Sequence, residues 1–224
     1  FYSNFFDNWS NYLQSPGIIP LKGVFNNIPA FIIAAGPSLD KNMGLLHSVT
    51  GKAVLISVGT ALKPLLNNGV VPQFVVAIDS EEININAFDM DEIPERLWLL
   101  YDPCIPKEIP DKFKVNKLVF DSNVDLPQWI AKQIEEKGSL GKNFSVAHTS
   151  FKLAKYLACE PIILVGQDLA FDGHRLHCSE SFYNQSKLDH FNEKLTINLL
   201  HKKKHAGYGP SLSFVRDLFD ISTT

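Results

Sequence analysis

The stretch Ala30-Phe31-Ile32-Ile33-Ala34-Ala35-Gly36-Pro37-Ser38-Leu39-Asp40 decides the fold class of this chain. Its leading apolar run has the length of a buried strand, and the Gly-Pro-Ser that follows is typical of a turn into a helix. The same order recurs over residues 53–68, where an apolar run is followed by Gly59-Thr60 and a helical pattern. We expect that second helix to begin at Ala61 or later, because Pro64 is unfavourable inside a helix.

Further apolar runs and helical patterns continue this alternation along the chain. Uninterrupted apolar strands that alternate with helices are typical of a parallel sheet covered on both faces. The sequence therefore predicts an α/β fold, with a Rossmann-like, mostly parallel sheet and helices on both faces. One helix, over residues 126–137, is expected to have Asp125 as its N-cap and Gly138 just after its end. The remaining expected strands cover residues 74–78, 97–101, 117–120 and 161–165, and the remaining expected helices cover residues 5–13, 146–158 and 214–219.

The two ends of the chain differ in regularity. The pattern weakens from about residue 171, so we expect residues 1–178 to form the Rossmann-like domain, opened by a docking helix. Residues 179–224 are expected to form a less regular lid-like or acceptor-side segment. Because the chain begins with Phe1 and not with Met, we also expect it to be a piece of a longer protein.

Composition excludes several classes of protein. The chain has 21 Lys and Arg residues and 24 Asp and Glu residues, which gives a net charge of −3. A protein that binds nucleic acid mainly through the phosphates needs an excess of Lys and Arg, so this class is excluded. The three cysteines form no CxxC pair, so we predict neither a disulfide framework nor a structural zinc site, and we expect a cytoplasmic protein. No apolar run approaches the ~20 residues of a membrane span.

Polar residues follow the expected strands at their carboxyl ends, which is where ligands bind in open parallel sheets. Ser38 is expected to cap the helix that follows it, and amides at that helix start suit a phosphate. The Asp79 carboxylate is suited to accept hydrogen bonds from ribose hydroxyls or to bind a divalent cation. The chain has neither a GxGxxG nor a GxxxxGK[ST] motif, and no set of residues predicts a metal site. The groups of residues that follow the expected strands are Gly36-Pro37-Ser38, Ser57 with Gly59-Thr60, Asp79-Ser80 and Gly166-Gln167-Asp168.

Four stretches together resemble a known family: residues 33–40, residues 56–62 with 68–79, Ser145-Val146-Ala147-His148-Thr149, and residues 163–173 with His177. In this order they are similar to the motility accessory factor family, whose central domain is also described as hydroxymethylpterin pyrophosphokinase-like. The resemblance implies a glycosyltransferase that moves a nonulosonic acid, of the pseudaminic, legionaminic or sialic type, from a CMP-activated donor to Ser or Thr of flagellin. Some similarity to bacterial sialyltransferases points to the same donor chemistry.

The resemblance also implies roles for individual residues. The base that activates the acceptor hydroxyl is a separate hypothesis, because a histidine suits that role: we expect His177, with His201 and His205 as alternatives, and Asp168 is grouped with it as catalytic. One departure from the family is Asn143-Phe144, where the family tends to have glycine before Ser145. The residues implied to bind the sugar nucleotide are Gly36, Pro37, Ser38, Gly59, Thr60, Asp79, Ser145, Gly166 and Gln167.

Two alternatives remain open at this point. The pterin pyrophosphokinase branch would need ATP, Mg²⁺ and acidic ligands such as Asp79 and Asp168, whereas a CMP leaving group requires no metal. A non-catalytic nucleotide-binding scaffold is the other alternative.

Overall fold

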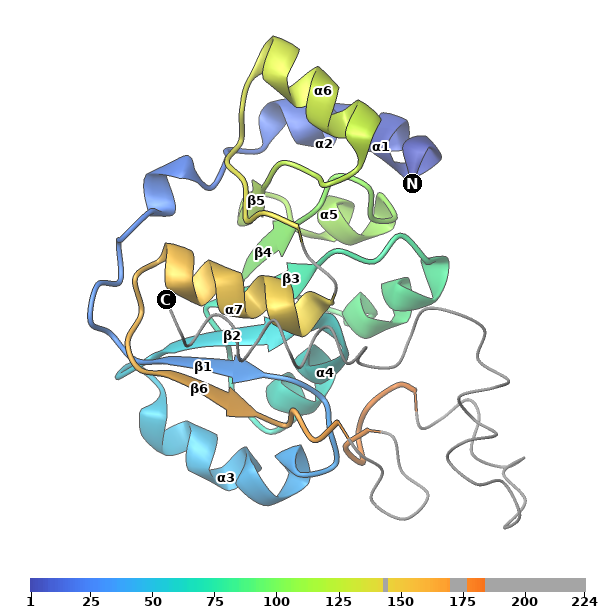
Figure 1. The fold of residues 1–224 in the computed structure, drawn as a ribbon. Helices are drawn as coiled ribbons and strands as arrows, with labels where there is room; N and C mark the ends of the chain where they lie inside the picture. Colours follow the sequence, from blue (N-terminus) through green and yellow to red (C-terminus); the bar gives the residue numbers. More distant parts are fainter. Residues whose placement is uncertain (143–144, 170–176, 184–224) are drawn as a thin grey trace.

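The computed structural model describes residues 1–142, 145–169 and 177–183 (Figure 1). The expected lid-like segment therefore lies outside the described residues, apart from 179–183. His201, His205 and Asn143-Phe144 also lie outside them. Within the described residues, no helix is both long and apolar enough to cross a membrane.

A six-stranded sheet with the order β5-β4-β3-β2-β1-β6 forms the centre of the molecule, and every neighbouring pair of strands is parallel. All the strands predicted from the sequence are present, and their ends agree to within two residues. The α/β fold class is thus confirmed, and the sheet is wholly parallel. Its strands are β1 (Ala30–Ile33), β2 (Val54–Val58), β3 (Phe74–Ala77), β4 (Trp98–Tyr101), β5 (Lys117–Val119) and β6 (Ile162–Val165).

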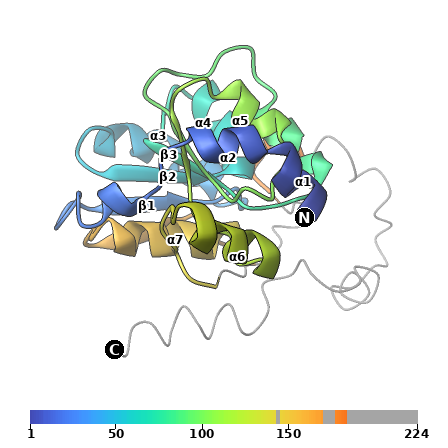
Figure 2. The same cartoon turned by 90° about the horizontal axis from the view of Figure 1, so that it is seen from above.

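Helices cover both faces of this sheet, as the view from above shows (Figure 2). Helices α3 and α4 lie on one face and α7 lies on the other, while α1 and α2 lie beside the β4 and β5 end. The helices are α1 (Tyr2–Asp7), α2 (Trp9–Gln14), α3 (Leu39–Val49), α4 (Gly59–Asn67), α5 (Glu108–Lys112), α6 (Asp125–Ile134) and α7 (Val146–Tyr156), with short 3₁₀ helices η1 (Ile19–Leu21) and η2 (Glu82–Phe88).

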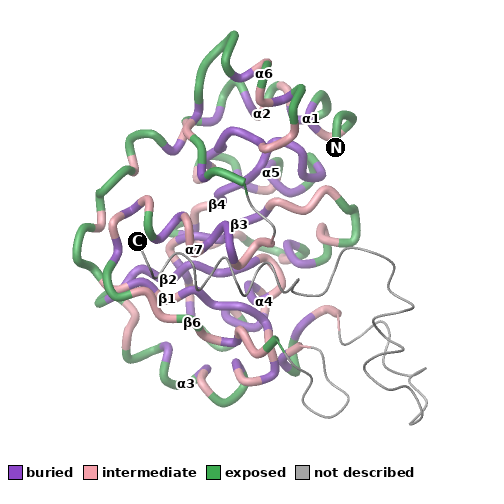
Figure 3. The backbone as a smooth tube through the Cα atoms, viewed as in Figure 1, coloured by how far each residue is buried: buried purple, intermediate pink, exposed green. Residues whose placement is uncertain are grey.

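Side-chain alternation along the strands explains why both faces need a helix. Successive strand residues point to opposite faces. Ile32 therefore packs in the cluster that contains Leu153 of α7, whereas its neighbour Ile33 packs in the cluster that contains Leu39 of α3. The buried segments form the middle of the fold in Figure 3. Both faces of β1 and β2 are therefore shielded from water, and only the ends of these strands are open to a ligand.

Two predicted helices differ at their ends from what the sequence suggested. Helix α6 begins at Asp125 itself and stops at Ile134, so Asp125 is not an N-cap and Gly138 is not the residue after the helix. Gly138 instead donates its amide hydrogen to Asp121 Oδ2 at 3.0 Å. Helix α4 begins at Gly59, earlier than expected, and contains Pro64. Its buried apolar face outweighs the hydrogen bond that Pro64 cannot donate.

The expected docking helix near the N-terminus is two short helices, α1 and α2, separated by Asn8. The Asn8 side chain is buried and donates to the carbonyls of Pro103 (3.2 Å) and Ile105 (2.6 Å), beyond the end of β4. Asn4 on α1 donates to the carbonyls of Ser80 (3.0 Å) and Cys104 (2.9 Å). These amide side chains fix the N-terminal helices to the loops that follow β3 and β4.

Candidate functional site

Strand order brings the predicted polar clusters together at one edge of the sheet. Strands β3, β2, β1 and β6 are adjacent, and their carboxyl ends point the same way (Figure 1). Strand β6 reverses the direction in which strands are added, because it joins β1 on the side away from β2. A change of this kind opens the crevice in which ligands bind in such folds. The residues brought to this edge are Gly36-Pro37-Ser38, Gly59-Thr60, Asp79 and Gly166-Gln167-Asp168, and the start of α7 at Ser145 lies over the sheet beside them.

Two loops touch at the junction of β1 and β6. The amide of Gly36 donates to the Gly166 carbonyl at 2.7 Å, and the amide of Ser38 donates to Asp168 Oδ2, also at 2.7 Å. A Cβ atom on Gly36 would collide with the Asp168 carboxylate and the Gly166 carbonyl. Gly166 has a φ of +69°, and a Cβ there would fall on the Ala34 carbonyl. This contact therefore requires glycine at both positions.

The backbone amides at the start of α3 already have hydrogen-bond acceptors within the protein. Ser38 holds the N-cap position but its hydroxyl makes no capping hydrogen bond, so the predicted cap is wrong. The amides of Leu39, Asp40 and Lys41 donate to the carbonyls three residues before them, at 3.0, 3.3 and 3.1 Å. Because Asp168 takes the amide of Ser38, a phosphate at this helix start would have to displace that carboxylate.

The starts of α4 and α7 differ from that of α3. Ser145 caps α7, since its hydroxyl accepts from the His148 amide at 3.1 Å. Helix α4 begins at Gly59 and has no side-chain cap. A Cβ on Gly59 would lie 3.2 Å from the ring of Phe88, so glycine allows η2 to pack against this helix start. Of the three helix starts, α4 is therefore the one whose first amides donate to neither a carboxylate nor a hydroxyl among the residues that the structure describes.

His177 lies against an aromatic ring near the end of β3. Its ring stacks on Tyr183, with 5.1 Å between centroids and 16° between planes. Burial raises the pKa of Tyr183, and the negative charges of Asp79 and Glu81 raise it further. Tyr183 is therefore within electrostatic range of these carboxylates. Sequence reasoning missed Tyr183, because it lies in a segment without any regular pattern.

Sequence reasoning also missed Asp102 and Asp121, although each lies one or two residues beyond the end of its strand, as Asp79 does. Asp102 accepts from the Cys104 amide at 2.8 Å, and burial raises its pKa to about 6. Asp121 accepts from the amides of Lys137 and Gly138, each at 3.0 Å. Both carboxylates are buried and hold connections in place, whereas Asp79 is partly exposed.

Ligands for a metal ion do not gather in the part of the chain that the structure describes. No group of three or more His, Cys, Asp or Glu side chains there is arranged to hold one. The three cysteines, Cys104, Cys159 and Cys178, are buried and reduced.

The fold and this strand-end site define a Rossmann-like α/β domain. The family described as 6-hydroxymethylpterin diphosphokinase MptE-like matches residues 3–174, and the chain belongs to this family. The family resemblance seen in the sequence is thereby confirmed.

One solved structure of similar fold is the MAf glycosyltransferase from Magnetospirillum magneticum AMB-1, with 21% sequence identity and a TM-score of 0.57. The match covers 67% of this chain and 24% of that protein, so the chain spans about a quarter of the glycosyltransferase. No curated protein sequence matches the chain. At this identity the likeness establishes a shared fold.

Replacing Gly166 by alanine should destabilise the protein by at least about 2 kcal/mol, because the new Cβ meets the Ala34 carbonyl at a positive φ. Urea denaturation measures the free energy of unfolding. Gly44→Ala is the matched control, since Gly44 lies within α3 with open space around it and alanine there should stabilise by up to about 1 kcal/mol. Equal effects of the two substitutions would contradict the steric account.

Asp102 should make stability depend on pH between about 4 and 6. Its pKa in the folded protein is about 6, above the ordinary value of 3.8, so the folded state holds more protons than the unfolded state in this range. The contribution of Asp102 is therefore most favourable below this range and falls as pH rises through it, by on the order of 2–3 kcal/mol.

Asp102→Asn should remove this contribution. The free energy of unfolding of the variant, measured in urea at pH 4, 5, 6 and 7, should gain on that of the wild type as pH rises. The exposed Asp91→Asn variant is the control and should run parallel to the wild type. A parallel course for Asp102→Asn would show that burial does not raise this pKa.

Proposed function

We propose that this domain is the sugar-nucleotide-binding core of a glycosyltransferase that transfers a nonulosonic acid from a CMP-activated donor to Ser or Thr of flagellin or another acceptor protein. The carrying observation is that the Cys178 amide donates to the Ala35 carbonyl at 2.7 Å, so that the neighbouring His177, stacked on Tyr183, lies at the same carboxyl edge as the Gly36 turn. A histidine next to a nucleotide crevice suits the activation of an acceptor hydroxyl. The fold shared with the MAf glycosyltransferase supports the same class of reaction.

The donor phosphate is proposed to bind at the start of α4. Gly59 and Thr60 begin this helix without a side-chain cap, in the middle of the edge between Gly36 and Asp79. The first amides of an α-helix have no partner within the helix, and their positive end favours an anion. At the starts of α3 and α7, by contrast, Asp168 and Ser145 already accept amide hydrogens.

Gln167 supplies a further contact in this proposal. Its side-chain oxygen is buried and accepts no hydrogen bond from any described residue. Buried polar atoms of this kind normally have partners, so an N–H or O–H of the donor is proposed to satisfy it. Gly36, Pro37 and Gly166 shape the adjoining wall. Asp168 is proposed to act by holding the Gly36 turn, through its bond to the Ser38 amide.

In the proposed reaction, the bond between the anomeric carbon of the sugar and the CMP phosphate breaks, and CMP leaves with the electron pair. The acceptor hydroxyl oxygen bonds to the same carbon, and its proton passes to His177. CMP is a good leaving group, so this chain's own task is to orient the two substrates, to stabilise the departing phosphate and to remove the proton.

A diphosphokinase that uses ATP and Mg²⁺ is the second candidate, favoured by the description of the family. In that reaction Asp79 and Asp168 are the proposed metal ligands. The Asp168 carboxylate, however, is bonded to the Ser38 amide at 2.7 Å. Mg²⁺ binding would require Asp168 to release or share that bond, which the glycosyltransferase proposal does not require.

Ligand-induced stabilisation distinguishes these candidates. At a concentration about 100-fold above its Kd, CMP should stabilise the protein by about 2.7 kcal/mol and raise the melting temperature by about 5–10 °C. ATP with Mg²⁺ should not. Stabilisation by ATP with Mg²⁺, abolished by EDTA and not reproduced by CMP, would favour the kinase. No stabilisation by either would favour a scaffold without nucleotide-dependent activity.

His177→Ala should lower the kcat of sugar transfer by about 10²–10⁴-fold and leave the affinity for CMP unchanged, because the side chain acts on the acceptor proton. Transfer is measured with the CMP-sugar donor and an acceptor peptide or protein, and CMP affinity by calorimetry. The control is His47→Ala, an exposed histidine in the last turn of α3. An unchanged kcat in His177→Ala would rule out this base.

A further inference from the structure

The segment that carries His177 and Tyr183 lies across two helices of the Rossmann-like domain. Its Cys178 amide donates to the Ala35 carbonyl at 2.7 Å, directly after β1. The Cys178 side chain is fully buried in the cluster that contains Leu39 of α3. Residues 177–183 are therefore held at the same edge as the candidate site.

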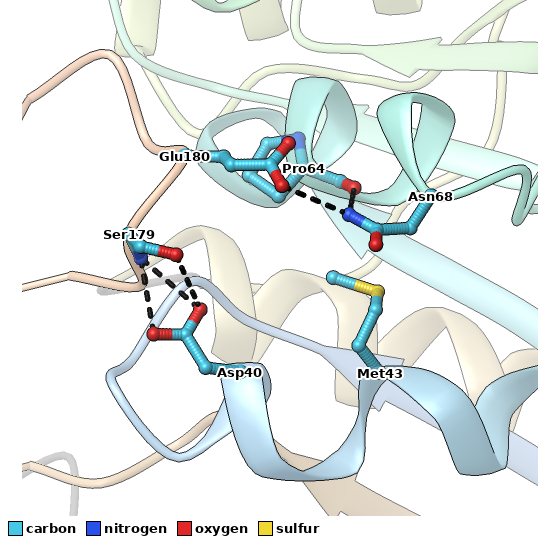
Figure 4. A pocket seen from close by; sticks show the side chains of 6 residues that line it. All are labelled: Asp40, Met43, Pro64, Asn68, Ser179 and Glu180. Carbon is cyan, nitrogen blue, oxygen red and sulfur yellow. Dashed lines mark hydrogen bonds between the residues drawn. The ribbon is translucent and has the colours of Figure 1, made fainter.

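Side chains from α3 and α4 hold this segment at two points (Figure 4). Asp40, in the first turn of α3, accepts from the Ser179 amide at 3.1 and 3.2 Å and from the Ser179 hydroxyl at 3.1 Å. At the end of α4, the Glu180 carboxylate accepts from the side-chain amides of Asn67 at 2.9 Å and Asn68 at 3.2 Å. Neighbouring residues of one turn are thus bonded to two different helices.

We propose that Asp40, Asn67 and Asn68 are positioning residues, and that they form with Ser179 and Glu180 a polar clasp that sets the place of His177. The clasp residues Ser179 and Glu180 follow Cys178 directly in the chain, and His177 precedes it and stacks on Tyr183 of the same segment. The kinetic part of this inference rests on the proposed function, whereas the structural part does not.

Hydrogen bonds at the surface make this clasp separable from the fold. Asp40, Ser179 and Glu180 are exposed, and none of them belongs to the core clusters beneath the sheet. Exposed hydrogen bonds are individually weak because water competes for the same groups. Local opening at this turn therefore leaves the sheet intact, while it uncovers Cys178 and releases His177.

Thiol labelling tests the clasp without any assay of activity. In Asp40→Ala, a maleimide should modify Cys178 at least about 10-fold faster than in the wild type, with Cys104 and Cys159 as protected references in the same chain. Asn68→Asp is the second variant, because it places a like charge against Glu180 at almost constant size. Asp125→Ala is the matched control, since Asp125 is also an exposed aspartate in the first turn of a helix, α6.

An unchanged Cys178 rate in both clasp variants would overturn the proposal. Equal acceleration of all three cysteines would also overturn it, because the substitutions would then loosen the whole domain. Faster labelling confined to Cys178, with the control unchanged, supports the clasp.

Kinetics then tests the positioning of His177. Asp40→Ala should lower the kcat of transfer about 10-fold at an unchanged KM for the donor, and adding Asp40→Ala to His177→Ala should have no further effect. Independent, additive effects would overturn the positioning role. If labelling changes as expected but the wild type transfers no sugar, the clasp stands and the proposed function fails.

Discussion

The contact between the loops after β1 and β6 is the constraint on which the candidate site depends. Gly36 donates to the Gly166 carbonyl, and Asp168 takes the Ser38 amide from the other loop. Neither glycine has room for a Cβ atom, so backbone approaches backbone directly. This contact fixes where α3 begins, and through Asp40 on α3 it also bears on the segment that carries His177.

The starts of α3, α4 and α7 lie along the same edge of the sheet, but they differ in the group that accepts their first amide hydrogens. A carboxylate takes an amide hydrogen at the start of α3 and a serine hydroxyl does so at the start of α7, whereas α4 begins without a cap. Because an uncapped helix start favours an anion, the proposed phosphate position moves from Ser38 to Gly59 and Thr60. Because Asp168 and Ser145 already accept amide hydrogens at two of the three helix starts, fewer positions are left for the donor phosphate than the sequence motifs suggested.

The search for polar residues just after the predicted strands found part of the candidate site and missed part of it. It led to Asp79, and the same reasoning would have led to Asp102 and Asp121, which also lie within two residues of a strand end. Burial distinguishes Asp79 from the other two, because Asp102 and Asp121 accept hydrogen bonds from backbone amides inside the protein. Tyr183 gave no signal at all, because its importance comes from stacking on His177 and not from any periodic pattern.

The strands, the longer helices, the α/β class and the parallel sheet were predictable from the amino-acid sequence, because apolar runs and glycine turns are local signals; the exact helix ends and the short helices α5, η1 and η2 were not. The sequence also determined the family, through motifs in a fixed order. Tertiary structure alone decided which helix start is uncapped, that Asp168 binds Ser38 across 130 residues, and that Asp40 holds Ser179. Such contacts join residues distant along the chain, and their geometry follows from strand order and packing, which no local pattern records.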